Sequence, residues 1–201
     1  MPGQIKIDDG AGNYTILTNA GSLGSDKTIT IPNTTGTMAL TSDISAGGLS
    51  VADQWILTAD AAFNGDITSN LARSTEASLA PTIGSGVSES SGIFTFPETG
   101  IYKISVQAQS IVNNSYGDLT MYINTTTDNF STTDNAARIL IYENNGVAYD
   151  TSYASVLFDV TDTTTHKVKF TISGWTNAAE KFLGNTQQAY TAFQFLKIGE
   201  T

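Results

Sequence analysis

Few residues in this 201-residue chain have side chains suited to catalysis, and their types restrict the reactions that it could perform. The only His is His166, and there is no Cys, so the chain has no thiolate nucleophile, no disulfide and no Cys-bound zinc. A lone His could act as a general base or a pH switch. No carboxylate motif or nucleophile elbow accompanies His166, so we expect a structural residue at a turn or strand end. We predict no catalytic residue and no enzymatic activity.

Two Asp-containing segments carry the oxygen ligands that Ca²⁺ prefers. They are Asp8-Asp9-Gly10-Ala11-Gly12-Asn13 and Asp159-Val160-Thr161-Asp162, and neither matches an EF-hand loop. Asp and Asn side chains also close turns by hydrogen bonding to nearby backbone groups. We favour the turn interpretation, because short motifs often match by chance. The prediction is therefore no metal site and no cofactor, with Ca²⁺ as the less favoured alternative.

Aromatic and amide side chains near expected loops or on outward strand positions could bind a glycan. The set comprises Asn114, Tyr116, Tyr122, Phe130, Tyr142 and Trp175. Exposed aromatic patches more often mark contacts between subunits, and the sequence leaves both readings open. We take Asn114, Tyr116, Phe130 and Trp175 as the candidate receptor surface.

The composition favours a folded β-protein whose partners are neither nucleic acid nor membrane. Thr, Ser and Asn make up 63 of the 201 residues, whereas hydrophobic residues still reach 40%. β-Branched and hydroxyl-bearing residues favour strands and turns over helices. The net charge is −10 with nine Lys plus Arg, which disfavours nucleic acid and anionic membrane surfaces. No apolar run approaches a membrane span, and residues 1–4 do not look like the start of a signal peptide.

The pattern changes near residue 48, which predicts two domains, 1–48 and 49–201. The first holds short β-like runs at 4–8, 14–18, 27–31 and 37–41, and ends in the flexible joint Ser45-Ala46-Gly47-Gly48. Runs this short cannot bury a core alone. We therefore expect residues 1–48 to be an attachment arm that becomes ordered against other chains.

Residues 49–201 alternate apolar and polar residues with period two, as half-buried strands do. We expect about eight strands, at 54–63, 93–96, 101–112, 117–125, 136–143, 149–160, 165–174 and 188–198. Short strands separated by turn residues indicate an all-β sandwich or jelly roll.

Two of these strands carry apolar residues at both alternations, which indicates burial on both faces. A two-layer sandwich would leave one of those faces in water, and a second subunit would cover it. We therefore predict an oligomer. The candidate interface residues are Tyr149, Tyr153, Leu157, Tyr190, Phe193 and Phe195.

Residues 92–104 carry the pattern Phe94-Thr95-Phe96-Pro97-Glu98-Thr99-Gly100-Ile101-Tyr102-Lys103-Ile104. This segment resembles the core motif of the C1q/TNF-like jelly-roll superfamily, and 155–160 and 192–198 resemble two further strands of that family. Gln194 stands where the family often has Gly. The resemblance covers about 49–201 and implies an antiparallel jelly roll that forms homotrimers. Its members sometimes bind calcium near the trimer axis.

The N-terminal segment resembles a motif that recurs in tail-fibre and other virion proteins of tailed phages. The matching residues are Asn13 to Leu17, Lys27 to Pro32 and Thr35 to Asp43. This resemblance implies attachment to other virion proteins through Tyr14, Ile16, Ile29, Ile31, Met38 and Leu40.

Together the two resemblances imply a non-enzymatic structural protein on the surface of a phage particle, at the tail or the capsid. The favoured reading is a trimeric fibre or appendage, anchored by its arm, whose C-terminal domain is displayed outward or binds a host cell-surface glycan. The alternatives are a capsid decoration (cement) protein and a soluble C1q/TNF-like ligand-binding module.

Overall fold

The fold is seen in a computed structural model, which describes residues 5–8, 10–12, 14–17, 49–76, 78, 82–113, 117–143, 147–176 and 179–201. The chain divides into two compact units, Met1–Ser45 and Ala46–Thr201. In the first unit, β1 (Ile5–Asp8) and β2 (Tyr14–Leu17) form an antiparallel hairpin. Tyr14 and Ile16 belong to β2. The other proposed attachment residues, Ile29, Ile31, Met38 and Leu40, lie outside the described residues.

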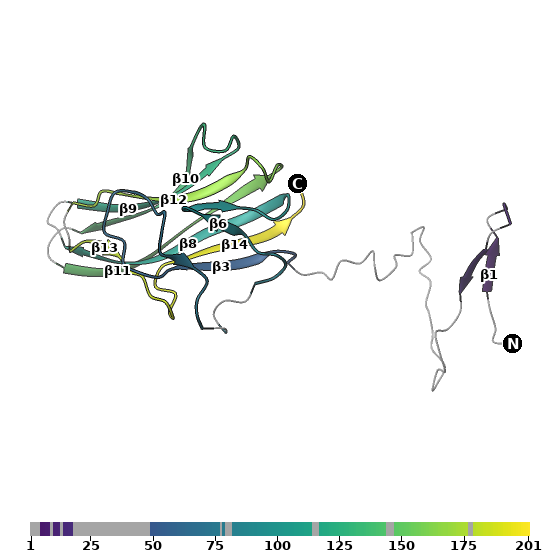
Figure 1. The fold of residues 1–201 in the computed structure, drawn as a ribbon, viewed down its shortest axis with the longest axis horizontal. Helices are drawn as coiled ribbons and strands as arrows, with labels where there is room; N and C mark the ends of the chain where they lie inside the picture. The colour runs from purple at the N-terminus through teal and green to yellow at the C-terminus, as the bar shows by residue number, and fades with distance from the viewer. Residues whose placement is uncertain are drawn as a thin grey trace. The chain divides into compact units, whose positions relative to one another are not determined.

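The second unit consists of two antiparallel β-sheets, as the alternation predicted, with no α-helix among the described residues (Figure 1). The β8 sheet has the order β11-β8-β14-β3-β5, with β13 also paired to β8. Its strands are β3 (Ala52–Leu57), β5 (Leu71–Ala72), β8 (Gly100–Asn113), β11 (Val147–Val160), β13 (Lys181–Phe182) and β14 (Ala192–Gly199).

The β9 sheet has the order β10-β9-β12-β7-β6, with β4 also paired to β12. Its strands are β4 (Gly65–Asp66), β6 (Ser88–Ser90), β7 (Ile93–Thr95), β9 (Gly117–Thr126), β10 (Asp134–Glu143) and β12 (Lys167–Ser173). The chain passes repeatedly between the two sheets. After β8 it forms the β9–β10 hairpin, returns as β11 beside β8, crosses to β12 beside β9, and returns as β14. This order is consistent with a jelly-roll sandwich.

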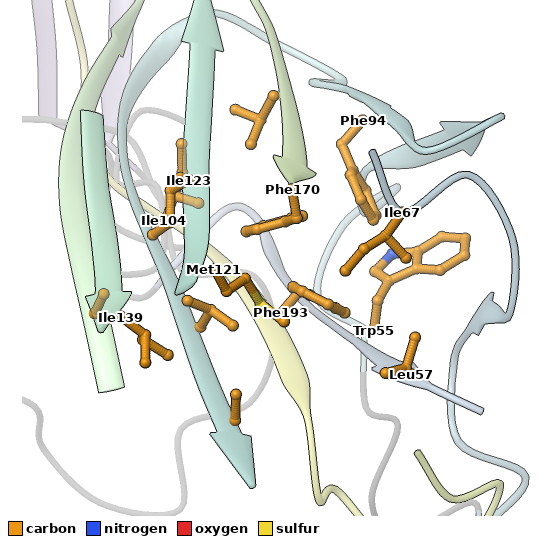
Figure 2. Packing of buried hydrophobic residues seen from close by; sticks show 14 of the residues in the cluster. Trp55, Leu57, Ile67, Phe94, Ile104, Met121, Ile123, Ile139, Phe170 and Phe193 are labelled. Atoms are coloured by element: carbon orange, nitrogen blue, oxygen red, sulfur yellow. The ribbon is translucent and has the colours of Figure 1, made fainter. Parts of the chain in front are cut away.

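The core lies between the two sheets and is rich in aromatic rings (Figure 2). Phe94 from β7 and Phe170 from β12 meet Phe193 and Phe195 from β14. The ring centroids are 4.2 Å apart for Phe170 and Phe193 and 4.9 Å apart for Phe94 and Phe195. All four side chains are fully buried. Burial of a large aromatic ring stabilises a fold by several kcal/mol, so this cluster holds the two sheets together.

The β7–β8 turn explains the motif that the sequence singled out. Phe94 and Tyr102 are fully buried on either side of the turn, and the Tyr102 hydroxyl donates a 3.0 Å hydrogen bond to the Glu98 carbonyl. Gly100 has φ +146°, and a Cβ there would press on the Lys197 side chain and the Gly199 carbonyl. The reversal between these strands therefore depends on Gly100 and on the buried aromatic pair.

Candidate functional site

The outward face of β11 carries three large apolar side chains that the single chain leaves in water. Tyr149, Tyr153 and Leu157 are 76%, 55% and 62% exposed. Ala154 on the opposite face of the strand is buried, and Val156 packs partly against the core. Side chains alternate across a strand, so the strand presents one face to the core and the other face to solvent.

The strand register shows which side chains share this face of the β8 sheet. One row joins Tyr153, Gln107, Ala192 and Ile56, and a second row joins Leu157, Lys103, Leu196 and Ala52. Between them lies the polar row Ser155, Ser105, Gln194 and Gln54. We call this surface the β8-sheet face. Ala192 and Ile56 are buried within the chain, so the large exposed apolar side chains of this face lie on β11, beside polar neighbours, a mixture that is typical of protein interfaces.

The polar row is ordered by its own hydrogen bonds. The Gln194 amide donates a 2.7 Å bond to the Gln54 side-chain oxygen, and the Ser105 hydroxyl donates a 3.4 Å bond to Gln194. Hydrogen bonding to Ser105, and then to Ser155, holds the pKa of the Tyr153 phenol below its ordinary value of 10.0. The bonds among Ser105, Gln194 and Gln54 hold the side chains of this row in place.

Two residues predicted for the subunit interface lie elsewhere. Phe193 and Phe195 are fully buried within the chain's own core, so the prediction of an interface position was wrong for both. They occupy the inward positions of β14, whereas Gln194 and Leu196 point outward. Tyr190 precedes β14 and is partly exposed, and its carbonyl accepts a 3.0 Å hydrogen bond from the Gln109 backbone.

Two residues of the candidate receptor surface are described. Asn114 and Tyr116 lie outside the described residues. Phe130 follows β9, and its ring centroid lies 4.6 Å from the Lys169 ammonium, whereas Trp175 follows the other end of β12. About 13 Å of strand separates Lys169 from Ser173, and Trp175 lies beyond it. That these residues form one receptor surface stays a prediction.

Trp175 has a structural role. Its ring packs against the core, and its Nε1 donates a 3.0 Å hydrogen bond to the Glu180 carbonyl. Its backbone amide donates to the Asn64 side-chain oxygen at 3.0 Å, and the Asn64 amide donates back to its carbonyl at 2.9 Å. These bonds close the loop after β12.

His166 and Asp162 are also structural, as predicted. His166 directly precedes β12, is 8% exposed, and has a Thr hydroxyl near each ring nitrogen, Thr161 at 3.2 Å and Thr165 at 3.1 Å. Asp162 accepts hydrogen bonds from the Thr164 backbone and hydroxyl, both at 2.7 Å. Within the described ranges, no group of three His, Cys, Asp or Glu side chains could hold a metal ion.

Sequence reasoning missed a groove on the outer face of the β9 sheet. It is lined by Tyr122, Asn135, Ala137 and Arg138, and it lies where the register of β9 and β10 shifts between Asn135 and Ala137. Such a β-bulge inserts an extra residue into one strand and re-aims nearby side chains. Tyr122 was included among the glycan-binding candidates, and Asn135 ends the loop 128–135 that was expected to contact a host glycan, but Arg138 carried no motif that could have identified it.

In comparison with known proteins, no family model matches this chain and no curated protein matches its sequence. In the part of the chain that the structure describes, there is no helix that is long and apolar enough to cross a membrane.

Proposed function

We propose that this chain is a non-enzymatic structural protein of a tailed-phage virion, built as a homotrimer whose subunits meet through the β8-sheet face. The observation that carries the proposal is the exposure of Tyr149, Tyr153 and Leu157 on one strand of that face. Monomeric proteins rarely leave a large contiguous apolar patch in water. A second copy that covers it would stabilise the assembly.

The resemblance of residues 13–43 to tail-fibre segments supports the assignment to a virion. In this proposal residues 1–48 attach the trimer to other virion proteins, at the particle surface. The second unit of the chain is then displayed outward.

The test is the mass of the full-length protein in solution. Wild type should have three times the mass of the 21.2 kDa chain when measured by light scattering at micromolar concentration. Tyr153→Asp and Leu157→Asp place a charge on exposed positions of the β8-sheet face, so each variant should fold but dissociate. Circular dichroism should remain that of wild type.

Matched controls come from the edge strand of the other sheet. Leu140 and Tyr142 on β10 are 46% and 59% exposed, so Leu140→Asp and Tyr142→Asp make the same change away from the proposed interface. Both controls should remain trimeric. A monomeric wild type would refute the proposed assembly, as would a Leu157→Asp variant that stays trimeric.

The place on the particle is tested by copy number. Quantitative mass spectrometry of purified particles should find a few tens of copies if the trimer is a tail fibre or appendage. Hundreds of copies on the capsid would instead identify the decoration protein, and absence from the particle would contradict both.

A further inference from the structure

The groove on the β9 sheet has the size and chemistry of a small binding site. Its volume is about 360 Å³, which lies at the lower end of the range of about 300–1,000 Å³ for small-molecule sites. It is lined by one cation, one amide, one phenol ring and Ala137. Tyr122 and Arg138 are direct partners in the β9–β10 register, and Asn135 pairs with Asn124 in the neighbouring row.

Arg138 is a free cation in a strongly acidic chain. Four other described cations form ion pairs: Arg73 with Asp53, Lys169 with Asp66, Lys181 with Asp60, and Lys197 with Glu98 and Glu200. Lys167 instead donates to the Thr163 carbonyl. No described residue forms an ion pair or hydrogen bond with the Arg138 guanidinium. Its neighbours in the register, Tyr122 opposite and Thr120 and Asn124 diagonally, carry no acid. An exposed guanidinium offers five donors in a planar fork that matches a carboxylate.

Asn124 adds a buried acceptor beside the groove. The side chain is 4% exposed, and its Nδ2 donates a 2.6 Å hydrogen bond to the Thr171 hydroxyl. Thr171 donates in turn to the Asp66 carboxylate at 2.6 Å. Because the Asp66 carboxylate can only accept, Thr171 must accept from Asn124, and the amide orientation is thereby fixed.

This orientation leaves the Asn124 Oδ1 atom without a hydrogen-bond partner, although it is buried. An unpaired buried acceptor is costly. Asn124 lies opposite Asn135, which lines the groove, but Asn124 is not itself one of the lining residues. The groove therefore presents the Asn135 amide, and not Asn124, to a ligand.

We propose that this groove binds a carboxylate-bearing sugar residue, a uronic acid unit of a surface polysaccharide. The Arg138 guanidinium pairs with the sugar carboxylate, and the Asn135 amide forms hydrogen bonds with ring hydroxyls. Tyr122 is partly exposed, and its ring offers an apolar body with a polar tip against which the sugar packs. A neutral sugar would leave Arg138 unused.

The groove remains accessible in the proposed trimer, because it lies on the outer face of the opposite sheet from the β8-sheet face. The inference rests on the proposed display function for its biological role, since a displayed domain would meet host polysaccharide. Binding of the sugar itself does not depend on the number of subunits, so it can be measured separately.

The experiment is ligand-observed saturation-transfer NMR on the full-length protein with three probes: methyl β-glucuronide, methyl β-glucoside and glucose 6-phosphate. Wild type should bind the glucuronide and not the glucoside. Arg138→Gln should weaken glucuronide binding about 10- to 100-fold, as expected for loss of a charge-assisted hydrogen-bond pair. Arg138→Lys keeps the positive charge but loses the planar arrangement of donors. It should therefore bind glucuronide more tightly than Arg138→Gln and less tightly than wild type.

Lys181→Gln is the matched control, because it removes one positive charge at a distance from the groove and should bind like wild type. Binding of glucuronide that is equal in wild type and Arg138→Gln would overturn the proposal. So would binding of glucose 6-phosphate at least as tight as that of glucuronide, or no glucuronide binding at all. A monomeric protein that still binds glucuronide through Arg138 would refute the proposed trimer and leave the sugar site standing.

Discussion

The buried Asp53 carboxylate accepts two hydrogen bonds from the Arg73 guanidinium, at 2.9 and 2.6 Å. Asp53 is 3% exposed, and it also accepts from Trp55 Nε1 at 3.1 Å and from the Val87 backbone amide at 2.8 Å. The guanidinium in turn lies 4.6 Å from the Trp55 ring centroid. One acidic side chain therefore ties β3 to the segments that carry Arg73 and Val87.

We expect Asp53→Ala to lower the free energy of unfolding by about 3 kcal/mol, since it leaves the Trp55 and Val87 donors unpaired in a buried site. Asp53→Asn keeps one acceptor oxygen and should cost about half as much. Arg73→Gln should also be strongly destabilising, because it leaves the Asp53 carboxylate, whose side chain is 0% exposed, buried without its counter-ion. Urea unfolding measures all three. If all three variants lost the same small amount of unfolding free energy, Asp53 would not tie these segments together.

Phe195→Ala separates a core position from an interface position. The ring is fully buried against Phe94 and Phe96, and truncation of such a residue costs about 3–5 kcal/mol. The variant should unfold at a markedly lower temperature, while its folded fraction keeps the wild-type mass in light scattering. If the variant dissociates without any loss of thermal stability, Phe195 contributes to the subunit interface and not to the core.

Tyr102 makes the stability sensitive to base. Burial, assisted by the negative charge of Glu98, raises the pKa of the Tyr102 phenol from 10.0 to about 12. Because the folded pKa is the higher one, the stabilisation is fully present below pH 10 and is lost as the pH rises towards 12. Tyr102→Phe should cost about 1 kcal/mol at pH 7 through the lost bond to Glu98. Unfolding measured from pH 7 to 12 should show this difference shrinking; a constant difference would contradict the assignment.

The long strands could be predicted from the sequence because their alternation is sustained. β8 and β11 each have 14 residues, and the apolar positions of β11 identified Tyr153 and Leu157 as outward. The strands β4, β5, β6 and β13 have two or three residues each, too few for any period. β4, β5 and β13 each pair with a longer strand, and β6 pairs with the equally short β7.

Some residues of the candidate sites were likewise misplaced or missed by sequence reasoning, for physical reasons that can be named. Phe193 and Phe195 were misplaced because the bulk of a side chain does not reveal which face of a central strand meets the other sheet. The groove could not be predicted, since Tyr122 and Arg138 meet only through the register of a hairpin. That register includes a bulge beside Asn135, and no local residue pattern encodes it. The alternation of residues along a strand thus predicts which side chains share a face. A site whose residues come together only when two strands pair cannot be predicted in this way.

Asp66 should make the stability sensitive to acid. Partial burial by itself would raise the pKa of this carboxyl, but hydrogen bonds from Thr171 and Lys169 and the charge of Lys169 outweigh it and hold the pKa below 3.8. The lower folded pKa means that the stabilisation is present above pH 4 and disappears as the pH falls through the folded value. Asp66→Asn should lose about 1 kcal/mol at pH 7, seen as a lower Tm. This loss should shrink as the pH falls below 3.8, and Lys169→Gln should reproduce part of it. A Tm difference that is unchanged from pH 7 to pH 2 would show that the ionised carboxylate contributes nothing.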